Sequence, residues 1–149
     1  MDAIKLIKED HKTVEGLFKR FEEAGSKAYK TKRRLADRVI KELSVHAAIE
    51  EKILYPTMKQ LGGEFEEMVH EATVEHAETK NALRALVGLS GDDPMLDAKM
   101  SALIGGVRHH AEEEEKEMLP KFRQAMSRRE LEELGESLRL AKRTAPTRP

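Results

Sequence analysis

Apolar residues recur every three or four positions along most of this chain, with polar residues filling the positions between them. This spacing places the apolar side chains on one face of an α-helix. Strand signals are nearly missing, because β-branched residues are scattered and the residues that favour helices, such as Ala, Leu, Glu and Lys, dominate. The pattern predicts an all-α protein.

Turn residues divide the pattern into four long helices and a short fifth one. Proline cannot donate to the helix ladder, so Pro56 is expected to disturb the second helix and Pro120 the end of the fourth. Ser127, with Glu130 three residues later, predicts a capping box that starts the short helix. The turns Gly25-Ser26, Gly62-Gly63 and Ser90–Pro94 give long helices over about 3–24, 30–61, 64–89 and 94–126.

Helices joined by such short turns pack antiparallel to their neighbours, which predicts an up-down-up-down four-helix bundle. The 149 residues suit a single domain with one core. We expect the bundle to span residues 1–126, a short C-terminal helix to pack on or extend it over 127–143, and a disordered tail over 144–149.

Each of the four apolar stripes is interrupted by a histidine, and two are also interrupted by a glutamate one turn later. A single histidine on an apolar face is usually an ordinary core residue that finds a hydrogen bond. A buried ionised glutamate costs several kcal/mol unless it is paired or bound to a metal, and no Lys or Arg lies beside these on the stripes. The candidate metal ligands are His11, His46, Glu50, His76, His110 and Glu114.

The spacing of these residues places them at one height in the bundle. Successive histidines are separated by 35, 30 and 34 residues, and nearly equal steps in an up-down bundle return the chain to the same level. Residues four apart share a helix face, so His46 with Glu50, and His110 with Glu114, can reach one centre together. The segments 46–56 and 110–120 are identical at six of eleven positions, which indicates a pseudo-two-fold site for two metals bridged by two carboxylates.

Other residues near the stripes are assigned ordinary roles. His109 lies off the stripe and faces away, and His70 is expected to be exposed. Glu15 flanks its stripe and is better read as a solvated helix edge. Tyr55 lies near the site, where packing beside Pro56 is the favoured role.

Composition excludes several other functions. With 27 basic and 28 acidic residues the net charge is −1 and no basic stripe stands out, so no nucleic-acid partner is expected. Cysteine is absent, so thiolate metal sites, iron–sulfur clusters and cysteine nucleophiles are excluded. No signal peptide or apolar run of roughly 20 residues is present, and the helix faces are mixed and patch-free, which favours a cytoplasmic monomer without a membrane partner.

The arrangement of these residues on four successive helices resembles the hemerythrin-like, or HHE cation-binding, domain family in its four-histidine form. The strings Glu9-Asp10-His11, His46-Ala-Ala-Ile-Glu50-Glu51 with Tyr55-Pro56, and Glu75-His76 are similar to its motifs, and the likeness covers residues 1–125. It implies a bundle that holds two non-haem irons, bridged by carboxylates and an oxo or hydroxo group, and binds a small diatomic ligand or peroxide. Oxygen-carrying members use a fifth histidine four residues from the third-helix one, but Ala72 and Lys80 flank His76.

Three functions follow from these observations. The favoured one is a di-iron protein that binds O₂, NO or peroxide, with or without catalase- or peroxidase-like turnover. The second is an iron or oxygen sensor whose fold depends on the metal, because buried carboxylates without cations destabilise the metal-free form. The third is a structural or partner-binding bundle in which metal is incidental.

Overall fold

The computed structural model describes residues 1–149 and confirms the all-helical, up-down-up-down bundle with a short C-terminal helix. The second and fourth long helices each contain a π-helical turn (η) and are continuous through it. The elements are α1 (Ala3–Glu23), α2 (Tyr29–Ile49), η1 (Glu50–Leu54), α3 (Tyr55–Gln60), α4 (Glu64–Val87), α5 (Met95–Glu113), η2 (Glu114–Met118), α6 (Leu119–Ala125) and α7 (Arg128–Ala141).

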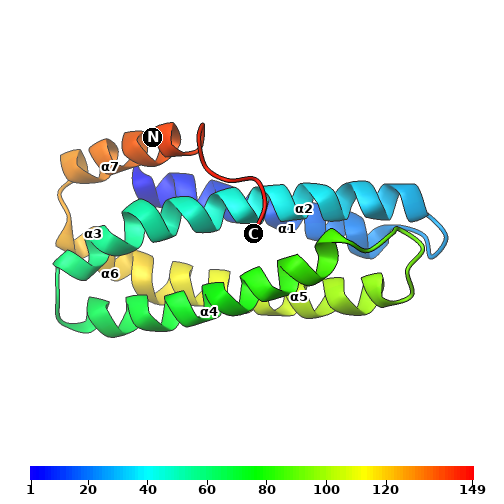
Figure 1. Ribbon diagram of the computed structural model, residues 1–149. Coiled ribbons are helices and arrows are strands. Elements are labelled where there is room, and N and C mark those ends of the chain that lie inside the picture. The colour runs from blue at the N-terminus through cyan, green and yellow to red at the C-terminus, as the bar shows by residue number, and fades with distance from the viewer.

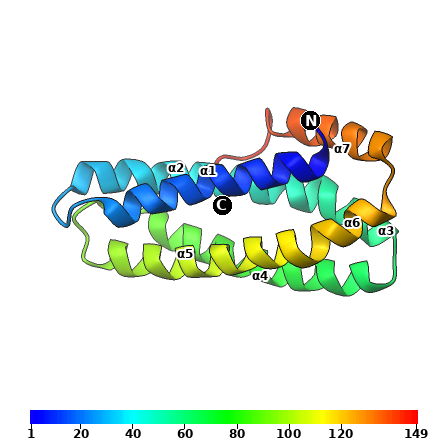
Figure 2. The ribbon, with the colours of Figure 1, turned by 180° about the vertical axis from the view of Figure 1, so that it is seen from behind.

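Each long helix packs against two others. The main contacts join α1 to α2, α2 to α4, α4 to α5, and α5 to α1, so α2 and α5 stand diagonally across the bundle. Figures 1 and 2 show the four long rods side by side, with α7 lying along the N-terminal half of α1. No helix is both long enough and apolar enough to cross a membrane.

The two predicted proline disturbances take the form of π-helical turns. η1 begins at Glu50 and ends one residue before Tyr55, whose backbone N–H donates to the Glu50 carbonyl. η2 repeats this arrangement from Glu114, with Leu119 donating to the Glu114 carbonyl. Pro56 and Pro120 then fall in the first turn of α3 and α6, where a missing N–H is tolerated. Single π turns occur frequently at functional sites.

The core consists of two apolar clusters that lie toward opposite ends of the bundle. One cluster includes Ile7, Leu54 and Phe122, and the other includes Phe18, Leu43 and Met100. The histidine-bearing positions fall between the two clusters on every long helix, because each stripe is apolar on both sides of its histidine. The predicted metal layer is therefore enclosed by apolar side chains from above and below.

The short helix α7 docks tightly on the start of α1. Ser127 and Glu130 form the predicted capping box at its first turn. A Cβ atom added at Gly135 would lie 2.1 Å from the carbonyl oxygen of Met1, so only glycine permits this close approach. Leu131 and Leu138 of the same helix are buried in the neighbouring apolar cluster.

Candidate metal centre

The six candidate ligands come from all four long helices and point into one layer. Glu50 and Glu114 have 0% exposure, and the histidines are buried or nearly so. Two groups of side chains offer donor atoms that lie within 4.8 Å of one another, namely His11, His46, Glu50 and Glu114, and Glu50, His76 and His110. Glu50 belongs to both groups, as expected of a carboxylate between two neighbouring positions.

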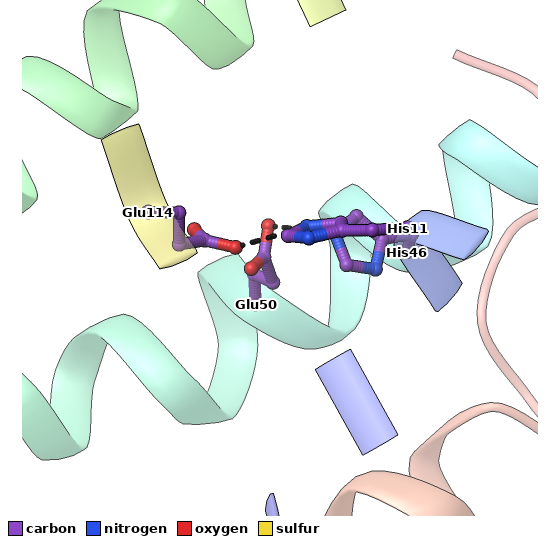
Figure 3. Close-up of side chains that lie close together, drawn as sticks. All are labelled: His11, His46, Glu50 and Glu114. Carbon is purple, nitrogen blue, oxygen red and sulfur yellow. Dashed lines mark ion pairs between the residues drawn. The ribbon is translucent and has the colours of Figure 1, made fainter. Parts of the chain in front are cut away.

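The first group brings two imidazoles against two carboxylates (Figure 3). His11 Nε2 lies 3.2 Å from Glu114 Oε1, and His46 Nε2 lies 3.1 Å from Glu50 Oε1. The atoms are close but poorly aligned with each other, since His46 Nε2 and Glu114 Oε1 have no partner with hydrogen-bond geometry. Donor atoms that converge without facing one another suit a shared cation between them.

The second group places two further imidazoles against Glu50 on the other half of the layer, with Glu114 close to one of them. His76 Nε2 lies 3.1 Å from Glu50 Oε1, and His110 Nε2 lies 3.5 Å from Glu114 Oε2. The two rings stand edge to face with centroids 5.0 Å apart, against 5.1 Å for the His11 and His46 rings. Glu50 Oε2 is buried without a partner, so this carboxylate also keeps an unused lone pair.

Tyr55 contacts the site, whereas its place beside Pro56 in the sequence had favoured a packing role. Its hydroxyl donates to Glu114 Oε2 at 2.6 Å and lies 3.2 Å from Glu50 Oε1. It also lies 3.1 Å from His76 Nε2 and 3.3 Å from His110 Nε2. In a regular α-helix a residue five positions after Glu50 is rotated away by about 140°, and the π turn restores it to the same face.

An outer ring of carboxylates fixes the histidines. Every Nδ1 atom of the four rings meets a carboxylate oxygen, which leaves each Nε2 directed inward and sets the ring orientation. Two of these carboxylates, Asp10 and Glu75, immediately precede His11 and His76 in the sequence. The other two, Glu51 and Glu115, immediately follow the buried glutamates, so adjacency in sequence was the signal that could have identified all four. The pairs are His46 with Asp10 at 2.8 Å, His11 with Glu115 at 2.6 Å, His76 with Glu51 at 2.9 Å and His110 with Glu75 at 2.8 Å.

Opposite charges in the layer control its protonation. Burial lowers the pKa of His110, but the hydrogen bond and charge of Glu114 outweigh it and raise the pKa to about 9. Burial also lowers the pKa of His46, but the nearby carboxylates of Glu50 and Asp10 outweigh this effect. The pKa of His46 is therefore well above its ordinary value. Burial and the nearby carboxylates raise the pKa of Tyr55. These raised histidine pKa values favour protonated imidazoles in the metal-free layer, so metal binding is expected to release protons.

The remaining candidates take the ordinary roles expected of them. His109 is 66% exposed and pairs only with Glu113, which is 49% exposed. His70 is exposed. Glu15 lies at the helix edge, where its carboxylate accepts hydrogen bonds from Arg108 at 2.8 and 3.0 Å.

A small cavity opens on the histidine side of the layer. Its volume is about 50 Å³, and all four ligand histidines contribute to its wall. The rest of the wall is mostly apolar and comes from the second apolar cluster, including Val14, Phe18 and Leu43, while Arg108 and Glu15 add a charged pair. Tyr55 does not line this cavity, because it belongs to the apolar cluster on the other side.

Comparison with known proteins agrees with this geometry. The family described as "Hemerythrin HHE cation binding domain" matches residues 2–122. A crystal structure of a hemerythrin HHE cation binding domain-containing protein from Mycobacterium kansasii is 26% identical and superposes with a TM-score of 0.82. The likeness covers 97% of this chain and 86% of that one, so it extends over the whole bundle.

A longer relative shares the same region. A Nostoc sp. protein described as a DNA nickase is 25% identical over 142 residues, which is 95% of this chain. The chain spans only 39% of that protein's length, so the nickase description concerns a much larger molecule.

Proposed function

This chain belongs to the hemerythrin HHE cation-binding domain family, and from that premise we propose that it is a non-haem di-iron protein that binds a small oxygen-derived or diatomic ligand. In this proposal the layer between the apolar clusters would hold two irons, with Glu50 and Glu114 as the carboxylates that the two would share. The proposed ligands are His11, His46, Glu50, His76, His110 and Glu114.

The observation that carries the proposal is the pair of fully buried carboxylates among four imidazoles. Glu50 and Glu114 keep unpartnered oxygens, and neither forms an ion pair with a lysine or arginine. An uncompensated buried carboxylate is costly, whereas a coordinated cation compensates it directly. In the metal-free chain the raised pKa values of His46 and His110 favour protonated imidazoles, which offset part of this negative charge.

The donor types favour iron among the available metals. Imidazole and carboxylate also bind zinc, manganese and copper. Closed structural zinc sites have four ligands around one ion, whereas here two donor sets share Glu50 and each includes two histidines. Two histidines with carboxylate and an open position is the donor set typical of non-haem iron that reacts with oxygen species.

The cavity favours a very small ligand. Its volume of about 50 Å³ holds a few water-sized molecules, whereas pockets for organic substrates have roughly 300–1,000 Å³. Its mostly apolar wall admits O₂, NO or hydrogen peroxide more readily than an ionic substrate. The histidines that line it place the ligand directly beside the proposed irons.

The chain's own residues have separable roles in this scheme. Bound irons would supply electrons and polarise the small ligand. The apolar wall formed by Val14, Phe18 and Leu43 excludes bulk water. Tyr55 holds its proton on the phenol oxygen against Glu114 Oε2, and thereby orients that carboxylate from the side opposite to the cavity.

Metal content and an optical spectrum of aerobically purified protein, followed by addition of hydrogen peroxide, test the proposal. We expect two irons per chain and near-ultraviolet charge-transfer bands that change when peroxide is added. Rapid oxygen evolution would identify catalase-like turnover, while a spectral change without turnover would identify a binding protein. Protein without iron, or with a single tetrahedral zinc, would refute the di-iron assignment.

The same buried carboxylates favour metal-dependent sensing as a second candidate. Without a cation the layer must retain protons or unpaired charges, so the metal-free bundle is destabilised. A sensor would lose much of its helix when iron is chelated, and far-ultraviolet circular dichroism measures this loss. Retention of the full helical signal after complete chelation would argue against the sensor.

A further inference from the structure

A side-chain contact joins the metal layer to the end of α7, a helix that lies beyond the residues covered by the family match. That match ends at residue 122, whereas α7 spans Arg128–Ala141. The helix is firmly held, because Leu138 is fully buried and Gly135 lies against the backbone of Met1. Figure 1 shows its end beside α1, the helix that bears Asp10 and His11.

Lys142, directly after α7, reaches the outer ring of carboxylates. Its Nζ atom donates to Asp10 Oδ1, while the other oxygen of Asp10 meets His46 Nδ1 at 2.8 Å. The side chains of His46 and Asp10 are 8% and 12% exposed and that of Lys142 is 31% exposed, so the contact between Asp10 and His46 is largely shielded from water. A lysine on one carboxylate oxygen fixes the other oxygen in place against the imidazole.

Of the other three outer carboxylates, one is also bound by a lysine and two are not. Glu51, which holds His76, is also bound by a lysine, but that lysine is Lys80 of α4 within the bundle. Glu75 and Glu115 form no ion pair with a lysine or arginine. Each half of the layer therefore has one histidine whose carboxylate is fixed by a lysine.

We propose that Lys142 is a positioning residue for the metal position formed by His11 and His46, acting through Asp10. The inference rests on the proposed function, since it concerns one of the two irons assigned there. Without the ammonium group, Asp10 is free to turn toward solvent, and the His46 ring loses its fixed orientation. Loss of a partner in the outer ring typically lowers metal affinity or activity about 10- to 100-fold, and Lys142 acts one contact further out.

Release of iron to a chromogenic ferrous chelator, measured on the reduced, iron-loaded full chain, tests this role. For Lys142→Met we expect about half of the iron to leave about tenfold faster than in the wild type, while the other half leaves at the wild-type rate. Lys142→Arg keeps the charge and the donors and should restore slow release. Lys80→Met is expected to affect the other half, because Glu51 holds His76.

Lys121→Met is the matched control, because Lys121 pairs with the exposed carboxylate of Glu64 and forms no ion pair with any of the outer carboxylates. Thermal unfolding of the metal-free variants separates positioning from folding, since a variant that stays fully folded at the assay temperature does not lose its iron through global unfolding. Wild-type release rates in Lys142→Met, or fast release in both Lys142→Met and Lys142→Arg, would overturn the inference. A wild type without two irons would refute the proposed function and this inference together, whereas two irons with unchanged release would refute only the inference.

Discussion

Replacing Tyr55 by phenylalanine removes the one hydroxyl that contacts both buried glutamates and two of the histidines. The change keeps the ring and deletes a 2.6 Å hydrogen bond to the Glu114 carboxylate. Hydrogen bonds to charged groups contribute about 1.5–3 kcal/mol. For a domain of this size, 1 kcal/mol corresponds to roughly 2–4 °C in Tm. We therefore expect the Tm of the metal-free protein to fall by about 3–12 °C, measured by calorimetry in the presence of a chelator.

The chain has two tyrosines, so Tyr29→Phe is a control with the same chemical change. Tyr29 is 45% exposed at the first turn of α2, away from the buried glutamates. Such surface changes are usually within about 0.5 kcal/mol. Equal Tm values for Tyr55→Phe and Tyr29→Phe would show that the Tyr55 hydroxyl does not hold Glu114, and would refute the role assigned to it.

Four further outcomes follow from the site, from the α7 contact and from an open glycine position in α5. The pKa of His110 rises from 6.5 to about 9 on folding, so the stabilising contribution of its protonated form is complete below pH 6.5 and is lost toward pH 9. The Tm of the metal-free protein should therefore fall between pH 6.5 and pH 9, whereas the Tm of the iron-loaded protein should not. Glu114→Ala should lose bound iron in elemental analysis, while its exposed neighbour variant Glu113→Ala should retain it. Gly135→Ala should destabilise by about 1–3 kcal/mol in urea unfolding, because its Cβ meets the Met1 backbone. Gly105→Ala in α5 meets nothing and should stabilise by about 0.4–1 kcal/mol.

The fold could be predicted from the sequence because the helical spacing of apolar residues is interrupted only at the site. Residues such as Phe18, Leu43 and Leu86 occupy the predicted stripes and are buried as expected. The capping box at Ser127 was equally readable, since it depends on residues three positions apart. Local signals of this kind need no knowledge of the tertiary structure.

The convergence of the six candidate ligands could also be predicted, because helical register and nearly equal spacing determine height and face. Burial of Glu50 and Glu114 on apolar stripes was the strongest part of that signal. The choice of His110 over His109 followed from register alone, and the structure agrees, since His110 is buried and His109 is exposed.

Only the tertiary structure decided the remaining members of the site. Tyr55 reaches the layer because a π turn replaces the regular helix before it, and a 3.6-residue period places it on another face. Asp10 shares no helix with His46, and Lys142 is 132 residues from Asp10, so no local spacing connects them. Sequence by itself therefore determined the fold and the ligand set expected of it, while the contacts that orient these ligands arose from packing between helices distant in sequence.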